Sequence, residues 1–321
     1  MVTGAAKPRA VFFGSPEFAV PCLQAAAETT ELVAVVSQPD RPAGRGKQLT
    51  EPPVKVAARQ LGPSVALLQP EKIRTPAFAE QLAAFNADLF VVVAYGRILP
   101  QGLLDLPRHG PWNVHASLLP RLRGAAPIQW AIIRGERRTG VSIMRMEAGL
   151  DTGPVAATAD TPIADDDTTG TLSPRLAALG ADLLRRVLPA IARGAIALQP
   201  QDDTAATLAP LLHKEDGHLD FTGPAVEVSA RARGVDPWPG AFALLDGQPL
   251  KLFRPRALPQ PFVAGSPGLV VTGADAGTDG LVVACGDGAV AFAELQMPGR
   301  KRLPAAAVLA GHALPAGTVL R

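Results

Sequence analysis

The feature that most constrains the fold is a regular alternation of short β-branched runs with longer helix-like stretches between residues 10 and 194. Strands are predicted at residues 11–13, 32–37, 64–68, 89–94 and 113–115. Several of these runs are apolar at every position, as strands buried on both faces of a parallel sheet must be. Helices are predicted at residues 17–27, 54–61, 77–85, 128–133 and 168–192. The alternation predicts an α/β domain with a mostly parallel sheet.

The pattern changes after a stretch rich in Ala, Gln, Asp and Thr, which we predict to be a linker. Two later segments, FALLDGQPLKLF and LVVACGDGAVAFAEL, place Asp-Gly between alternating apolar runs, which is the strongest short signal for a β-hairpin. Short helices are expected near residues 224–234 and 304–310. We therefore predict an α/β domain over residues 8–194, a linker over 195–212 and a small β-barrel over 213–321.

Composition sets few limits on partners. The chain is 47% apolar and 19% charged with a net charge of +2, which is typical of an ordinary globular protein. A secretory signal and a run of 18 apolar residues are both missing from the sequence, so we expect a cytoplasmic protein that does not enter a membrane. Cys22 and Cys285 lie far apart among apolar neighbours, which predicts two buried, reduced thiols.

Two other features favour structural roles over binding. The turn GSPEF at residues 14–18 could hold an anion on its backbone amides, but it lacks the G-x-G-x-x-G fingerprint of dinucleotide sites. Ser15 as an N-cap before Pro16 accounts for the residues as well.

The histidines show no paired metal-ligand spacing, so we expect no metal. Surface or turn positions are expected for His109, His213, His218 and His312.

Polar groups suited to chemistry occur in WNVHASLLPRLRGAAP, residues 112–127, at the carboxyl end of a predicted strand. Ligands bind at this end of the strands in open parallel sheets. Asn113 and His115 alternate on the strand and so point to one face, where an amide can polarise a carbonyl and an imidazole can transfer a proton. Asp151, in the motif GLDTGPV, can orient His115 or merely cap its own turn. The spacing leaves both interpretations open.

The segments NVHASLLPRLRGAAPIQWAI and GLDTGPV together closely resemble the family of formyltransferases that use 10-formyltetrahydrofolate. The resemblance covers the whole first domain and implies a Rossmann-like catalytic domain followed by an OB-like barrel. It implies that the catalytic residues are Asn113, His115 and Asp151.

The resemblance also implies where the folate co-substrate binds. Residues of SLLP and of AYGRILP are expected to form the wall of its pocket, namely Ser117, Leu118, Leu119, Pro120, Tyr95, Gly96 and Ile98. From hydrophobicity alone, the two leucines and the proline would be assigned to core packing.

The formyl acceptor needs a separate argument, because relatives with this core act on different amines. The loop QPDRPAGRGKQLTEPPVK, residues 38–55, resembles the acceptor-stem loop of the branch that acts on initiator methionyl-tRNA. It implies tRNA contacts by Arg41, Arg45 and Lys47. Cations on a Gly- and Pro-rich segment suit phosphates, although a short basic loop is usually just solvated.

The second domain resembles the C-terminal barrel that contacts tRNA in this family, but its charge is balanced. From His213 onward there are about ten basic and about ten acidic residues, so an RNA contact would need a local basic face. Two alternatives remain open: a formyltransferase acting on an amino sugar nucleotide, and a noncatalytic RNA-binding protein on the same core. The resemblance implies a monomer.

Overall fold

A computed structural model describes residues 7–43, 48–258, 266–271, 280–315 and 317–321. Its contacts form two compact units. The first contains Met1–Gly124, Thr139–Thr161 and Ser173–Leu208, and the second contains Ala125–Arg138, Pro162–Leu172 and Ala209–Arg321. Two short segments from within residues 8–194 thus pack with the second unit. The predicted domains are continuous stretches of the sequence, whereas each unit contains several separate stretches. The domain boundaries at residues 194 and 213 therefore stay a prediction.

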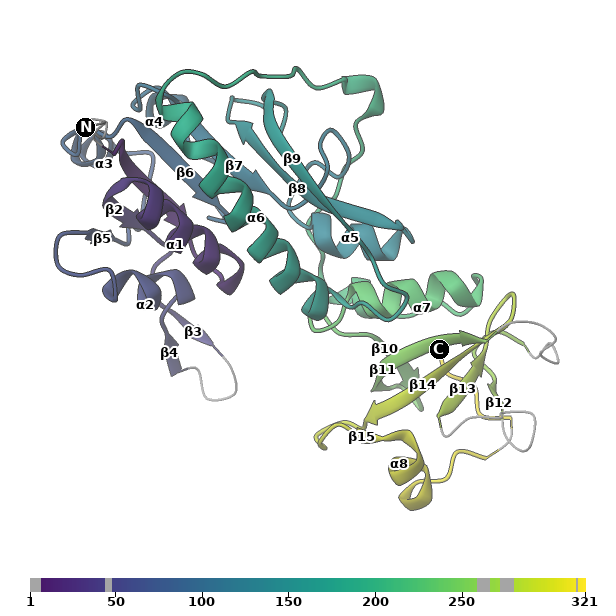
Figure 1. The fold of residues 1–321 in the computed structure, drawn as a ribbon. Helices are drawn as coiled ribbons and strands as arrows, with labels where there is room; N and C mark the ends of the chain where they lie inside the picture. The colour runs from purple at the N-terminus through teal and green to yellow at the C-terminus, as the bar shows by residue number, and fades with distance from the viewer. Residues whose placement is uncertain (1–6, 44–47, 259–265, 272–279, 316) are drawn as a thin grey trace. The chain divides into compact units, whose positions relative to one another are not determined.

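The first unit is built on a seven-stranded sheet in the order β5-β2-β1-β6-β7-β8-β9 (Figure 1). The five strands from β5 to β7 are parallel, and β8 runs antiparallel to β7. The strands are β1 (Arg9–Gly14), β2 (Glu31–Val36), β5 (Ala66–Leu68), β6 (Leu89–Val93), β7 (Pro111–His115), β8 (Arg138–Arg145) and β9 (Val155–Pro162). The predicted α/β class with a mostly parallel sheet is confirmed.

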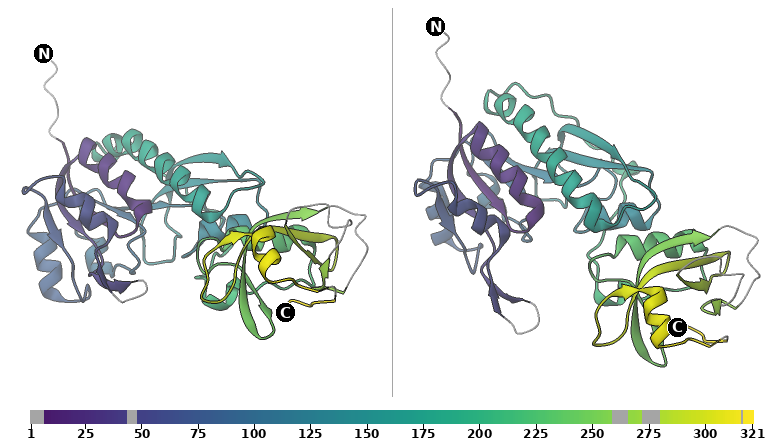
Figure 2. Two further views of the ribbon diagram at one scale, coloured as in Figure 1. Left: turned by 90° about the horizontal axis from the view of Figure 1, so that it is seen from below. Right: turned by 60° about the horizontal axis from the view of Figure 1, so that its bottom comes forward.

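Helices cover both faces of this sheet. On one face α1 (Val20–Thr29) and α6 (Thr169–Ala192) lie side by side, and Cys22 Sγ lies 3.9 Å from Ala177 O (Figures 1 and 2). On the other face, side chains of α3 (Pro76–Ala83) and α4 (Gln101–Leu104) pack with those of β1 and β6. The remaining helices of the unit are η1 (Glu17–Ala19) and α2 (Pro53–Arg59), with η2 (Asp203–Ala205) after α6.

The turn after β1 differs from its predicted form. Ser15 does not cap the following helix, whose N-cap is Pro16 without a side-chain hydrogen bond. Instead Ser15 Oγ accepts the backbone N–H of Gln38 at 3.1 Å, so it joins the ends of β1 and β2. A Cβ at Gly14 would lie 2.7 Å from the Phe12 ring and 3.0 Å from Val93 O, which explains the glycine as a packing requirement.

The second unit has an antiparallel sheet in the order β10-β11-β14-β13-β12, with β15 paired to β14. Its strands are β10 (Phe242–Leu245), β11 (Gln248–Leu258), β12 (Val270–Val271), β13 (Leu281–Ala284), β14 (Ala289–Gln296) and β15 (Leu303–Pro304). Its helices are α5 (Pro127–Ile133), η3 (Lys214–Gly217), α7 (Ala225–Gly234) and α8 (Ala305–Gly311). Both predicted Asp-Gly hairpins form, at Asp246–Gly247 and at Asp287–Gly288.

The end of the chain curls this sheet into an OB-like half-barrel. Val270, on one edge strand, donates its N–H to Thr318 O at 2.8 Å. Arg321 donates its N–H to Leu244 O, on the other edge strand, at 3.0 Å. One short segment thereby satisfies backbone groups on both exposed edges, which would otherwise be open to pairing with another chain. The predicted small barrel is confirmed as an OB-like half-barrel.

Across the described ranges of the whole chain, every helix is too short or too polar to cross a membrane.

Candidate active site

The candidate site lies in the first unit, where β7 ends. Asn113 and His115 alternate on β7, whose neighbours are β6 and the antiparallel β8. Asp151 follows β8 on a loop and has a φ of +52°, in the left-handed region that residues other than glycine seldom adopt. Residues far apart in the sequence therefore meet at the carboxyl end of a strand, as the open parallel sheet predicts.

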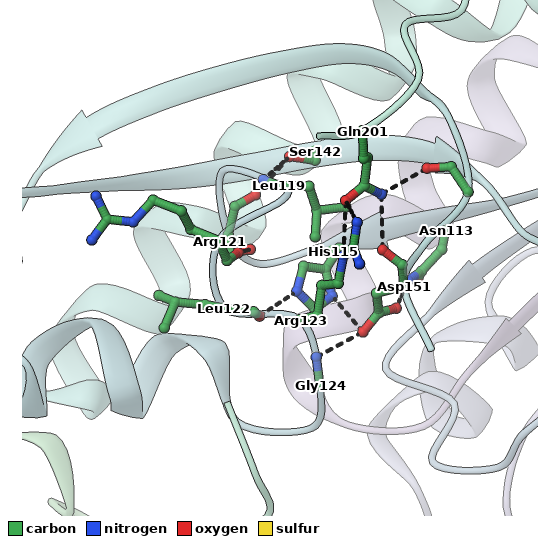
Figure 3. A network of polar contacts seen from close by, with 12 residues as sticks. Asn113, His115, Leu119, Arg121, Leu122, Arg123, Gly124, Ser142, Asp151 and Gln201 are labelled. Carbon is green, nitrogen blue, oxygen red and sulfur yellow. Dashed lines mark hydrogen bonds and ion pairs between the residues drawn. The ribbon is translucent and has the colours of Figure 1, made fainter. Parts of the chain in front are cut away.

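The Asp151 carboxylate lies among three groups (Figure 3). Asn113 Nδ2 donates to its Oδ1 at 3.4 Å, and the backbone N–H of Gly124 donates to its Oδ2 at 2.8 Å. His115 Nδ1 lies 3.6 Å from the same Oδ2. The structure thus brings together the three residues that the sequence singled out, and Asp151 contacts both others rather than only capping its own turn.

The other ring nitrogen of His115 faces a carbonyl. Nε2 lies 2.9 Å from Leu122 O, and the histidine is only 5% exposed. A carbonyl oxygen can only accept, so we assign the neutral ring's hydrogen to Nε2, which leaves the lone pair on Nδ1 beside Asp151. His115 therefore has no hydrogen directed to solvent in this tautomer. Asn113 is partly exposed, and its amide nitrogen carries a second hydrogen beyond the one given to Asp151.

Sequence reasoning missed two residues that hold this site. The buried Arg123 donates from Nε and Nη2 to Gln201 Oε1, at 3.0 and 2.8 Å. Gln201 Nε2 donates to two carbonyls of the Asp151 loop. Arg123 lies inside the motif quoted above, but Gln201 lies 78 residues away in the predicted linker, and nothing in the local sequence pairs the two.

The predicted folate wall is partly buried against β8. Ser117 Oγ donates to Arg121 O at 2.6 Å, and the backbone N–H of Leu119 donates to Ser142 Oγ at 3.0 Å. Leu119 packs on Met144 and Val155. Leu118 and Pro120 are half-buried. These contacts fit the packing interpretation of the segment, and its role toward folate stays a prediction.

The second part of the predicted wall follows β6, the strand beside β7. The Tyr95 ring packs edge-on against Phe13 with centroids 5.5 Å apart, and burial raises the pKa of its hydroxyl. That hydroxyl is buried and has no hydrogen-bond partner among the residues the structure describes. Gly96 has a φ of +80°, and Ile98 is 70% exposed. The role of this segment toward folate, like that of Ser117 to Pro120, stays a prediction.

The basic loop is anchored at its base. Arg41 is exposed on β3 (Arg41–Ala43), which pairs with β4 (Gln48–Thr50), whereas Arg45 and Lys47 lie outside the described residues. Lys55 Nζ lies 2.6 Å from Asp40 Oδ2, and Gln69 Nε2 donates to Asp40 Oδ1 at 2.7 Å.

In the described part of the chain, no group of three His, Cys, Asp or Glu side chains is arranged to hold a metal.

This fold and this cluster define a class of protein. Residues 8–188 match the formyl transferase family, and residues 211–313 match the formyl transferase C-terminal domain. The chain therefore belongs to the formyl transferase family.

A curated relative identifies the branch. The methionyl-tRNA formyltransferase of Myxococcus xanthus is 51% identical over 312 residues, covering 97% of each chain. Within the family, this chain belongs with the methionyl-tRNA formyltransferases.

Solved structures share the fold at much lower identity. HypX from Aquifex aeolicus in complex with tetrahydrofolic acid aligns with a TM-score of 0.61 at 18% identity, over 95% of this chain and 47% of that one. This chain thus spans about half of HypX. An N-formyltransferase from Helicobacter canadensis in complex with folinic acid and dTDP-3-aminofucose has a TM-score of 0.64 at 14% identity, over 91% and 100%.

Proposed function

We propose that this protein transfers the formyl group of 10-formyltetrahydrofolate to the α-amino group of methionine on initiator methionyl-tRNA. The observation that carries the proposal is the cluster of Asn113, His115 and Asp151 at the strand end. The 51% identity to a methionyl-tRNA formyltransferase over 97% of the chain supports the choice of acceptor. Product formation would serve translation initiation in the cytoplasm.

Asn113 is the donor for the formyl oxygen. When the amine attacks the formyl carbon, negative charge develops on that oxygen and must be stabilised by a hydrogen bond. The second hydrogen of the Asn113 amide can meet it while the first stays on Asp151. The Nε2 hydrogen of His115 is directed to Leu122 O, so the structure favours Asn113 over His115 for this role.

Asp151 and His115 together accept the proton that leaves the amine. The carboxylate lies on the Nδ1 side of the ring, where a lone pair is available, and Leu122 O holds the opposite nitrogen. When Nδ1 gains a proton, the resulting imidazolium lies between an anionic carboxylate and a carbonyl, both of which stabilise it. When the tetrahedral intermediate collapses, the bond between the formyl carbon and N10 of the folate breaks, and the proton held at Nδ1 passes to N10, so that tetrahydrofolate leaves as the neutral amine. The Gly124 N–H keeps Asp151 in place throughout the transfer.

The folate co-substrate binds beside the end of β6 in this proposal. We propose that it lies against Tyr95, Gly96 and Ile98 on one side and against the segment from Ser117 to Pro120 on the other. The exposed Ile98 side chain supports this placement as an apolar contact. Folate brings the formyl group, and the protein's part is to orient it toward Asn113.

The basic loop supplies the contact to tRNA in this proposal. Arg41, Arg45 and Lys47 bind phosphates of the acceptor stem, while the Asp40–Lys55 pair fixes the base of the loop. We propose that the protein works as a monomer, with the OB-like unit as a second tRNA contact. We propose that the catalytic domain spans residues 8–194 and the tRNA-contacting barrel spans residues 213–321, with residues 195–212 between them.

A competition assay tests the acceptor. Purified protein is given labelled 10-formyltetrahydrofolate with charged initiator tRNA and a dTDP-linked amino sugar at equal concentration. Label is expected on the methionine alone. Label on the sugar nucleotide would support the alternative of a sugar N-formyltransferase, and label on neither would revive a noncatalytic RNA-binding protein.

A further inference from the structure

The segment from Gln199 to Thr207 pairs with both loops that form the site. Gln199 and Val155 exchange two backbone hydrogen bonds of 2.9 Å where β9 begins. At the other end, Thr207 O accepts the N–H of Arg123 at 2.8 Å, and Thr207 Oγ1 accepts the N–H of Leu122 at 2.9 Å. This stretch was predicted to be a linker, yet its backbone ties the two loops to each other.

Gln201 uses its whole side-chain amide in this connection (Figure 3). Nε2 donates to Asp151 O at 2.8 Å and to Gly153 O at 2.7 Å, while Oε1 accepts twice from Arg123. An amide offers two hydrogens and two lone pairs, so all four are satisfied. Carbonyls only accept and a guanidinium only donates, which permits one orientation of the amide.

Arg123 links Gln201 to the other half of the site. It is 7% exposed, and its chain neighbours contact the candidate catalytic residues: Leu122 O holds His115, and Gly124 N–H holds Asp151. The Arg123–Gln201 contact therefore sets the distance between the loop that carries Asp151 and the loop that orients both side chains.

The Asp151 loop needs such support from outside. Asp151 has a left-handed backbone that is unfavourable for a residue with a Cβ. At Gly153 the chain passes so close to β8 that a Cβ would lie 1.8 Å from Arg145 O. Gln201 binds the carbonyls of both loop residues and so holds the backbone that presents the carboxylate.

We infer that Gln201, held by Arg123, is a positioning residue that keeps the Asp151 carboxylate aligned with His115 and Asn113. The inference rests on the proposed formyl transfer and deepens it, since it assigns a role to a residue that touches no reacting atom. Small displacements of a catalytic group lower the rate of chemistry more than they change binding.

Gln201→Glu is the sharpest test. Glutamate keeps the contact to Arg123 but presents an oxygen to the two carbonyls in place of the two hydrogens. We expect kcat to fall by about tenfold to a hundredfold with KM for both substrates nearly unchanged. Gln201→Met, which is neutral and of similar length, also lacks the two amide hydrogens and should show the same loss of kcat. It replaces Gln201→Glu as the test if the added charge disturbs folding. Thr204→Ala is the matched control, since Thr204 lies on the same segment and bonds only to Asp202 in the described contacts.

A double-mutant cycle separates positioning from general stability. If Gln201 acts through Asp151, then Gln201→Glu should not lower the residual rate of Asp151→Ala any further. Independent losses that multiply would overturn the inference, as would a kcat within about threefold of the native value for both Gln201 variants.

Amide hydrogen exchange gives a readout that does not depend on activity. Faster exchange confined to residues 149–153 is expected in Gln201→Glu and not in Thr204→Ala. Unchanged exchange there would overturn the inference. A native protein that transfers no formyl group would contradict the proposed function instead, and the exchange result would still decide whether Gln201 holds the loop.

Discussion

His115 shows how one residue's neighbours define its chemistry. Its Nε2 faces Leu122 O and its Nδ1 faces Asp151, so one nitrogen is held while the other is free to gain a proton. The spacing in the sequence left open whether Asp151 orients His115 or caps its own turn, and it did not indicate which ring nitrogen would face the carboxylate. The orientation of the ring depends on the contact of Nε2 with Leu122 O, seven residues away. A backbone carbonyl of this kind is present at every residue, so its position cannot be predicted from the residue types.

His115→Gln tests the proton-transfer role. Glutamine can donate to Leu122 O through its amide but cannot accept a proton, so the contact remains and the chemistry is lost. We expect kcat to fall about a hundredfold to ten-thousandfold, measured as single-turnover formylation. A fall of less than tenfold with intact folding would show that orientation alone, and not proton transfer, is the role of His115.

The two cysteines should be chemically inert in the folded protein. Burial raises the pKa of Cys22 to about 12 and that of Cys285 to about 11, so the reactive thiolate is scarce at neutral pH. We expect neither thiol to react with iodoacetamide near pH 8 until the protein is unfolded, as measured by mass spectrometry. Rapid labelling of either cysteine in the native protein would contradict the described burial.

At the scale of elements, the positions of the buried strands in the first unit were predictable from the sequence, but the short strands of the basic loop were not. The strands β1, β2 and β6 are apolar on both faces, so their positions follow from the sequence alone. The pairing of β3 with β4 was missed because each strand has only three residues and the side chains of β4 are exposed, so no apolar alternation marks them. Helix α4 is a four-residue turn and was missed for the same reason of length.

The anchor of the basic loop predicts a pH dependence. Hydrogen bonds from Gln69 and Lys55 lower the pKa of Asp40 below its ordinary 3.8. A carboxylate whose pKa is lower in the folded state adds stability above its unfolded value, and that stability is lost as the pH falls through the folded value.

Asp40→Asn should therefore lower the Tm near pH 7, and the difference from the native protein should shrink as the pH falls below 3.8. Thermal melts over this range measure it. Glu80→Gln, on the exposed face of α3, is a charge-matched control for which we expect little change. A difference that is the same at all pH values would show that the Asp40 charge does not stabilise the loop base.

At the scale of the whole molecule, the predicted division into two domains came from the change of hydrophobic pattern after the predicted linker, residues 195–212, and both Asp-Gly hairpins formed where expected. The sequence could not show that the chain's last residues pair with both edges of the second sheet, or that the stretch after α6 holds the site. Both depend on contacts between distant residues. Local patterns therefore located Asn113, His115 and Asp151 but not the groups that hold them together.

The measurement that tests the central claim most directly is single-turnover transfer of a labelled formyl group from 10-formyltetrahydrofolate to charged initiator methionyl-tRNA. It compares the native protein with Asn113→Ala, His115→Ala and Asp151→Ala. We predict rapid transfer by the native protein and, for Asn113→Ala, a loss of about a hundredfold to a thousandfold, with large losses in the other two. Near-native rates in all three variants, or no transfer by the native protein, would contradict the account.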